Sequence, residues 1–137
     1  MQTFLPYPNF QKSAECLDNK RLGKQRVEVY QILRTLTGKS TGWANHPAVK
    51  MWRGYETSLA VYGYWCCIEW ISRGYKDTLK PEFEAVVRTT NTADPDWITD
   101  VRVHESHRSN LLRKMPLWYS RFCWNVPNDL PYYWPVR

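Results

Sequence analysis

Glu28 stands four residues after Lys24 and seven after Arg21, so the three side chains share one face if this segment is helical. A carboxylate between cations stays ionised, and it can carry protons in acid–base chemistry or stabilise a developing positive charge. Alternatively, Lys24 and Glu28 form an ordinary i,i+4 ion pair that stabilises the helix by roughly 0.2–0.5 kcal/mol. The residues around Glu28 leave both interpretations open.

Basic residues concentrate near both ends of the chain. Residues 1–43 carry a net charge of +4, residues 44–103 of −1 and residues 104–137 of +3. Cations this dense can bind phosphate groups, although a solvated surface without a partner explains them equally well. If the two ends meet in the fold, they form a basic face that is typical of nucleic-acid-binding proteins. The two clusters are Lys20, Arg21, Lys24 and Arg26, and His104, His107, Arg108, Arg113 and Lys114.

The segment NHPAVKMWRGYE places His46, Trp52 and Arg53 near the start of an expected helix. Trp52 and Arg53 could stack on a displaced base, although core packing is the commoner role of such a tryptophan. His104 and His107 are three residues apart, and the chain offers only His46 as a third histidine, so the spacing does not predict a metal site. We also find no Walker loop, GxSxG, HExxH or GxGxxG motif and expect no cofactor.

Helices must position these side chains. Apolar spacing predicts one helix over about residues 13–37, within which Gly23 marks either a close backbone approach or a break. A second helix is expected over residues 47–73 unless Gly54 or Gly63 interrupts it. A short helix is expected over residues 81–88 and a third main helix over residues 105–114.

We therefore predict an all-α, compact single domain over residues 1–137, with about three main helices. Prolines make the first ten residues extended or turn-like, and the tail after residue 115 is rich in proline and aromatic residues. No run of 18 apolar residues exists, the N-terminus does not resemble a signal peptide, and the cysteines form no disulfide or zinc pattern. We expect a monomeric cytoplasmic protein, either nucleoid-associated or phage-encoded, with Cys66 and Cys67 buried and reduced.

Three segments, in this order, resemble the pyrimidine-dimer DNA glycosylase family, also called phage-type endonuclease V. The first is LDNKRLGKQRVE, residues 17–28, where two leucines and a later glutamate follow the family pattern. The second covers residues 45–78, from NHPAVKMWRGYE to SRGYKDT. The third is VHESHRSNLLRKMPLWY, residues 103–119. The resemblance spans the whole chain and implies a divergent branch of the family.

The resemblance implies an all-α fold in which the N-terminal segment threads between helices and carries its amine into the active site. Members excise cyclobutane pyrimidine dimers from duplex DNA and then nick the abasic site without a metal. The amine attacks C1′ and forms a Schiff base, while a glutamate on the first helix assists. An α-amine titrates near about 7.7–8.0, so much more of it is neutral at pH 7 than of a lysine.

The register that aligns Leu17 and Leu22 with the family implies that Glu28 is the catalytic glutamate. The amine belongs to Met1, or to Gln2 if Met1 is removed, and the large Gln2 is expected to hinder that removal. The complete set of expected DNA-binding residues is Thr3, Lys20, Arg21, Lys24, Gln25, Arg26, His46, Trp52, Arg53, His104, His107, Arg108, Arg113 and Lys114.

We expect a DNA glycosylase with abasic-site lyase activity on damaged or modified pyrimidines in duplex DNA. Three alternatives remain at this point: a glycosylase that activates water with Glu28, a non-catalytic reader of damaged or modified DNA, and a protein-interaction module with an incidental basic surface. The sequence does not identify the lesion.

Overall fold

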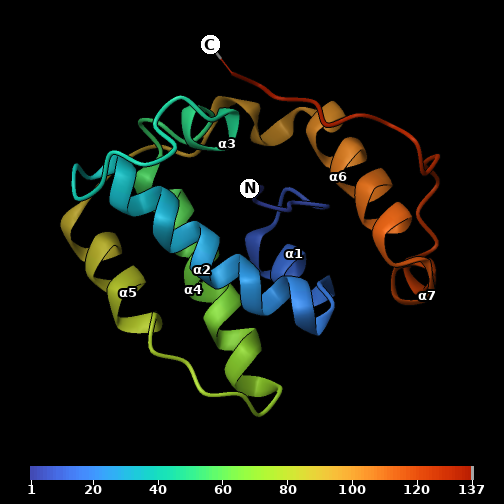
Figure 1. Ribbon diagram of the computed structural model, residues 1–137, viewed down its shortest axis with the longest axis horizontal. Helices are drawn as coiled ribbons and strands as arrows, with labels where there is room; N and C mark the ends of the chain where they lie inside the picture. The colour runs from blue at the N-terminus through green and yellow to red at the C-terminus, as the bar shows by residue number, and fades with distance from the viewer. Residues whose placement is uncertain (137) are drawn as a thin grey trace.

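In the computed structural model, which describes residues 1–136, the first eight residues form an extended segment. It runs between α2 (Asn19–Leu36) and α6 (Val101–Lys114), with the N-terminus near the centre of the molecule (Figure 1). Pro6 and Pro8 keep this segment out of a helix, because proline lacks an N–H and restricts the residue before it. The expected extended N-terminal segment is therefore confirmed.

The predicted helix over residues 13–37 is two helices, α1 (Phe10–Cys16) and α2. The break falls at Leu17 and Asp18, which have extended backbones, and the Asp18 carboxylate caps α2 by accepting from the Arg21 N–H. Gly23 does not break α2. A Cβ atom there would lie only 2.8 Å from the Trp70 ring, so this glycine permits the close packing of α2 on α4 (Glu56–Ser72).

The predicted helix over residues 47–73 is also divided, into α3 (Pro47–Lys50) and α4. The chain turns between them at Gly54, whose φ of +88° is a conformation that glycine adopts readily. The second half of the predicted helix is correct, and α4 buries Cys66 and Cys67 as expected. All four cysteines are free thiols.

The remaining helices follow the predicted order. α5 (Lys80–Thr89) matches the short helix expected near residue 81. After the 3₁₀ turn η1 (Asp96–Thr99), α6 begins four residues earlier than predicted, because Asp100 caps it by accepting from the Arg102 N–H. α7 (Pro116–Tyr119) and the 3₁₀ turn η2 (Ser120–Phe122) then lead into the tail.

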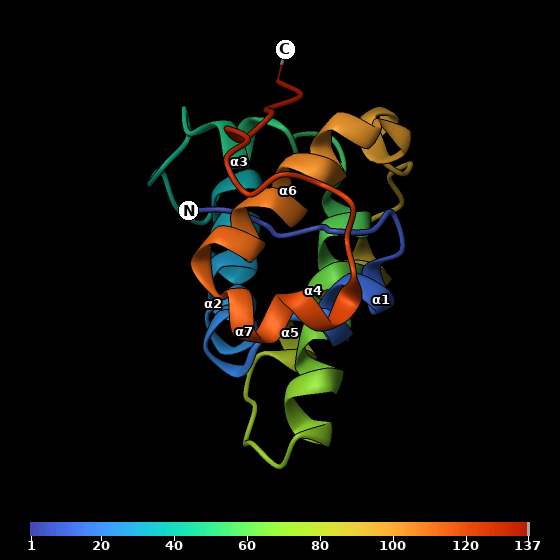
Figure 2. The ribbon, with the colours of Figure 1, turned by 90° about the vertical axis from the view of Figure 1, so that its right-hand side faces the viewer.

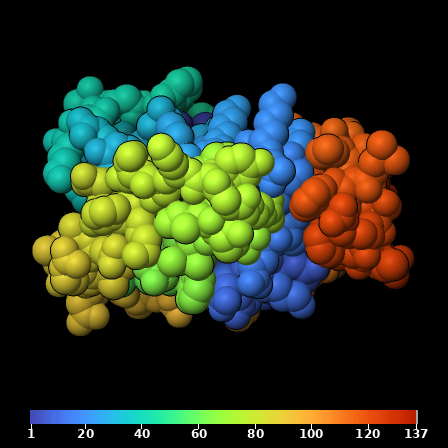
Figure 3. Space-filling view, turned by 90° about the horizontal axis from the view of Figure 1, so that it is seen from below, coloured from blue at the N-terminus to red at the C-terminus, as the bar shows by residue number. Residues whose placement is uncertain are grey.

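α1, α2 and α5 pack against α4 around one hydrophobic core, and α6 and α7 lie on the other side of the N-terminal segment (Figure 1). The tail runs back across α6 toward α3 (Figure 2), with the Leu130 and Tyr133 N–H groups donating to Ser109 and Ser106. From below, α4 and α5 occupy the face beside the N-terminal helices, and the α7 end lies beyond them (Figure 3). Residues 1–136 contain no strand, so the all-α prediction is confirmed. None of their helices is long and apolar enough to cross a lipid bilayer.

Candidate active site around the N-terminal segment

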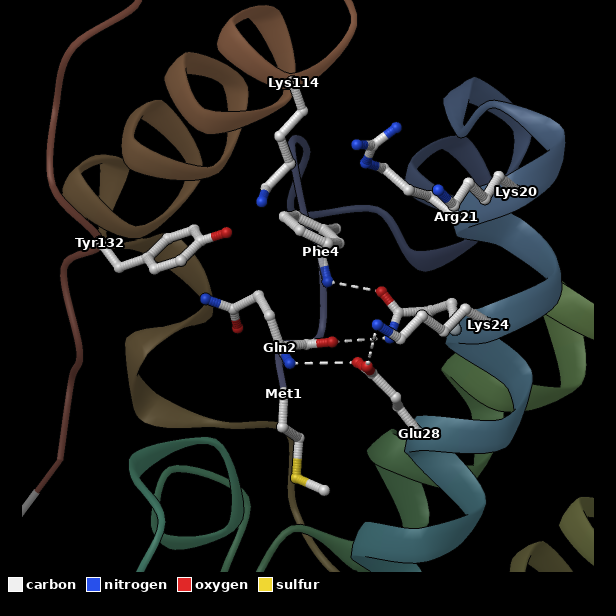
Figure 4. A pocket seen from close by; sticks show the side chains of 10 residues that line it. Met1, Gln2, Phe4, Lys20, Arg21, Lys24, Glu28, Lys114 and Tyr132 are labelled. Atoms are coloured by element: carbon white, nitrogen blue, oxygen red, sulfur yellow. Dashed lines mark hydrogen bonds and ion pairs between the residues drawn. The ribbon is translucent and has the colours of Figure 1, made fainter.

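A pocket of about 350 Å³ opens between the start of α2, the end of α6 and the first four residues (Figure 4). Its wall combines the first residues of the chain, four cations from both basic clusters, and Glu28. The two basic ends of the chain therefore meet at this pocket. This was the condition for the basic face that the charge distribution suggested. The lining residues are Met1, Gln2, Phe4, Lys20, Arg21, Lys24, Gln25, Glu28, Lys114 and Tyr132.

Glu28 lies directly against the N-terminal segment. One carboxylate oxygen accepts the Gln2 backbone N–H at 3.1 Å, and the other lies 3.6 Å from the Lys24 ammonium. The side chain of Glu28 is only 13% exposed, whereas that of Lys24 is 72% exposed. The ion pair predicted as the simpler role of Glu28 is thus present, and the same carboxylate also contacts the N-terminal segment.

Gln25, one turn before Glu28, holds the segment in register. Its carboxamide oxygen accepts the Phe4 N–H at 2.7 Å, and its amide nitrogen donates to the Gln2 carbonyl at 2.8 Å. The carboxamide therefore pairs with the extended chain as a neighbouring β-strand would. Tyr62 on α4 adds a hydrogen bond to the Phe4 carbonyl. Gln25 is 1% exposed, so this pairing is shielded from water.

α6 holds the next residues of the segment. Burial lowers the pKa of His107 to about 3, so the ring is neutral and its Nδ1 accepts the Leu5 N–H at 2.9 Å. The two ring nitrogens of His104 lie 2.7 Å from the Leu5 and Ile98 carbonyl oxygens. The Arg108 guanidinium donates to the Pro6 carbonyl. These three side chains bind the protein's own backbone, and the structure does not present the two buried histidines to DNA.

Three other predicted DNA contacts also lie inside the fold. Trp52 is completely buried and donates its indole N–H to the buried Thr3 hydroxyl, so neither can stack on a base in this conformation. Arg26 pairs with the buried Asp77 and lies over the Trp70 ring, away from the pocket. Their role in this structure is to pack the helices together.

The last three predicted residues lie outside the pocket wall. His46 caps α3 through its Nδ1; burial lowers its pKa, the nearby Met1 amine lowers it further, and Glu28 raises it, so His46 is close to the site. Arg53 is exposed and donates to the Ala44 carbonyl. Arg113 is exposed but is bound to the Asn128 carbonyl and to Asn110, which fixes the tail on α6.

Two aromatic residues of the pocket were not predicted. Phe4 lies on the floor between α2 and α6, and Tyr132 faces it from the tail with its hydroxyl toward the pocket (Figure 4). Burial raises the pKa of Tyr132, so its hydroxyl remains a hydrogen-bond donor at neutral pH. The aromatic tail was visible in the sequence, but no local pattern indicated which of its rings would reach the site.

A family model described as pyrimidine dimer DNA glycosylase matches residues 1–82. The match includes the N-terminal segment, Gln25 and Glu28, and it stops before α6. Searches of curated proteins and of solved structures found no match. Since the matched residues make up more than half of the 137-residue chain, the protein belongs to the pyrimidine dimer DNA glycosylase family and is, at this level, a DNA repair glycosylase.

Proposed function

We propose that this protein excises damaged or modified pyrimidines from duplex DNA and then cleaves the abasic site through a Schiff base. The N-terminal amine is the nucleophile, and Glu28 carries protons at the reacting centre. The observation that carries this proposal is the 3.1 Å contact between the nitrogen of residue 2 and the Glu28 carboxylate, inside a pocket lined by cations.

The charge of the pocket supports a DNA substrate. Lys20, Arg21, Lys24 and Lys114 surround one carboxylate, so the wall attracts phosphate groups overall. The mostly buried Glu28 carboxylate among these cations would repel phosphate. Phosphate binding therefore does not explain why a carboxylate lies here. Proton transfer at the damaged nucleotide supplies that reason.

The proposed chemistry balances without another reactant except water. The neutral amine attacks C1′, the bond from C1′ to the base nitrogen breaks, and the base leaves with the electron pair and takes up a proton. Opening of the sugar ring, with loss of a proton from nitrogen, gives the Schiff base. Removal of a C2′ proton then expels the 3′ phosphate, and water hydrolyses the Schiff base to return the amine.

The identity of the amine depends on Met1. The nitrogen beside Glu28 is the Gln2 amide while Met1 is attached, and an amide nitrogen is a poor nucleophile. The Met1 amine would then have to act from the same pocket, which Met1 also lines. If Met1 is removed, the Gln2 nitrogen itself becomes an amine against Glu28.

We further propose that the enzyme acts as a monomer in the cytoplasm, needs no metal ion and uses no cofactor. A non-catalytic reader of damaged or modified DNA is the principal competing function. It would use the same cationic wall without the amine chemistry.

The test uses two end-labelled duplexes, one with a thymine dimer and one with an abasic site, incubated with the protein in EDTA and sodium borohydride. A covalent adduct on both supports the complete proposal, and peptide mass spectrometry of the adduct assigns the amine to Met1 or Gln2. An adduct on the abasic duplex alone keeps the lyase and moves the glycosylase substrate to another base. Binding without an adduct or a nick on either duplex would favour the reader.

A further inference from the structure

The side chain of Trp43, in the turn between α2 and α3, is 63% exposed. No other tryptophan of the described chain is among its exposed large hydrophobic residues. Its φ of +64° lies in the left-handed region, which residues with a large side chain rarely occupy. Such strain persists only where surrounding contacts impose it, and it is concentrated at functional positions. The backbone therefore displays an indole in solvent at an energetic cost.

The turn is held by hydrogen bonds on both sides of Trp43. The Thr35 hydroxyl donates to the Gly42 carbonyl at 2.7 Å, and the His46 N–H donates to the Trp43 carbonyl at 2.9 Å. Arg53 donates to the Ala44 carbonyl at 3.2 Å. Trp43 thus projects from a turn that hydrogen bonds hold in place. A side chain that pushes into a partner needs such a fixed backbone.

A chain of aromatic contacts connects Trp43 with the active-site pocket. Its ring lies 5.9 Å from that of His46, which lies 5.9 Å from Trp134, which in turn lies 5.6 Å from the pocket residue Tyr132. Figure 4 shows the chain around α3 passing beside Met1. Trp43 is therefore at the outer end of a ring series that begins at the pocket, at most about 17 Å from the Tyr132 ring, which corresponds to about five base-pair steps of DNA.

The charge of this region identifies the partner. Residues 38–55 contain Lys39, Lys50 and Arg53 and no aspartate or glutamate, and all three cations are exposed. An exposed aromatic ring in a segment whose only charged side chains are cations matches stacked bases flanked by phosphates.

We propose that Trp43 is a wedge that inserts its indole into the base stack of duplex DNA within about five base pairs of the damaged nucleotide. This inference rests on the proposed function, because it places the wedge near the pocket that receives the lesion. Enzymes that act on a base must open the duplex, and apolar side chains that enter a base step offset the loss of stacking with their own contacts. A single-stranded substrate is already unstacked and has no need of the wedge.

The test compares two substrates, an abasic site in duplex DNA and the same site in a single strand, by the rate of borohydride adduct formation. Trp43→Gly removes the ring and also relieves the backbone strain, so the variant is expected to fold at least as well as the wild type. We expect the duplex-to-single-strand rate ratio to fall roughly tenfold in Trp43→Gly and to recover to within about threefold of wild type in Trp43→Phe. Leu117→Ala, which alters a 92% exposed side chain on α7, should keep the wild-type ratio.

A second readout does not depend on the chemistry. In duplexes with 2-aminopurine within about five base pairs of an uncleavable abasic analogue, wild-type binding should raise the fluorescence and Trp43→Gly binding should not. An unchanged ratio, an equal loss on both substrates, or an equal fluorescence rise in Trp43→Gly would each overturn the wedge. Failure of the wild type to form any adduct would overturn the proposed function instead, and the fluorescence comparison would still decide the role of Trp43.

Discussion

Gln25 holds the N-terminal segment with both ends of its carboxamide, so Gln25→Leu tests how the site is assembled. The leucine retains most of the volume but leaves the Phe4 N–H and the Gln2 carbonyl without their partner in a buried place. Loss of a hydrogen-bond partner from a buried group costs about 1–3 kcal/mol. For two such groups, we expect opening of the segment to become easier by about 2–6 kcal/mol, which is about 30-fold to more than about 10,000-fold in the opening equilibrium.

Hydrogen exchange of the Phe4 amide, followed by NMR, measures this opening directly. The amides of α4 should change much less, because the segment can leave its groove while the helices stay folded. Gln31→Leu is the matched control, since Gln31 is an exposed glutamine on the same helix. Borohydride trapping should fall in parallel with Phe4 protection. A wild-type exchange rate for Phe4 in Gln25→Leu would show that the carboxamide is not the clamp.

Three further predictions concern charge. Glu28→Gln should reduce excision at least 100-fold, the lower range for loss of an acid–base group, while DNA binding stays equal or tightens because a carboxylate leaves the cationic wall; full activity in single-turnover assays would remove Glu28 from the chemistry. Lys114→Ala should reduce the slope of log affinity against log salt by about 0.9, the value for one phosphate contact. Arg26→Ala should instead keep that slope and lower the free energy of unfolding by about 3 kcal/mol, because Asp77 loses its buried partner; the same slope change in both variants would contradict this division. Finally, burial lowers the pKa of His107 from 6.5 to about 3, so below pH 6.5 the unfolded chain takes up a proton that the folded protein does not, and stability falls by up to about 1.4 kcal/mol per pH unit down to about pH 3. His107→Asn keeps an acceptor that does not titrate, and urea unfolding at pH 7 and pH 5 should show a smaller loss in the variant; equal losses would refute the role of His107.

The helices could be predicted because apolar spacing is a local property. α2 and α4 each carry buried apolar side chains at helical spacing. The break before α2 was missed, whereas the break at Gly54 was left open as a possibility, and both have local causes. Asp18 has the side chain of a helix cap, and Gly54 has the freedom to take a positive φ. The Gly54 signal was recognised as a possible interruption, whereas the apolar pattern continued across Asp18 and concealed the cap.

Pairings between distant residues could not be predicted in the same way. His104, His107 and Arg108 were predicted to contact DNA, and the structure pairs them instead with backbone groups about a hundred positions earlier in the chain. Periodicity indicates which side of α6 is buried but not what is buried against it. An extended segment with unpaired backbone groups is an unusual partner, and only the threading of residues 1–8 between two helices provides it.

The spacing of Gln25 and Glu28 determines which nitrogen of the N-terminal segment lies against the Glu28 carboxylate. For the proposed reaction, this position matters more than the mere presence of an amine. The two side chains lie on one face of α2, about 4.5 Å apart along its axis. Gln25 pairs with the groups on either side of residue 3, and this fixes the nitrogen of residue 2 against Glu28. A nitrogen one residue earlier lies about 3.3–3.6 Å further along an extended chain. A Met1 amine can therefore approach the same carboxylate only if the chain bends or the Glu28 side chain follows it, whereas an amine on Gln2 would need neither movement.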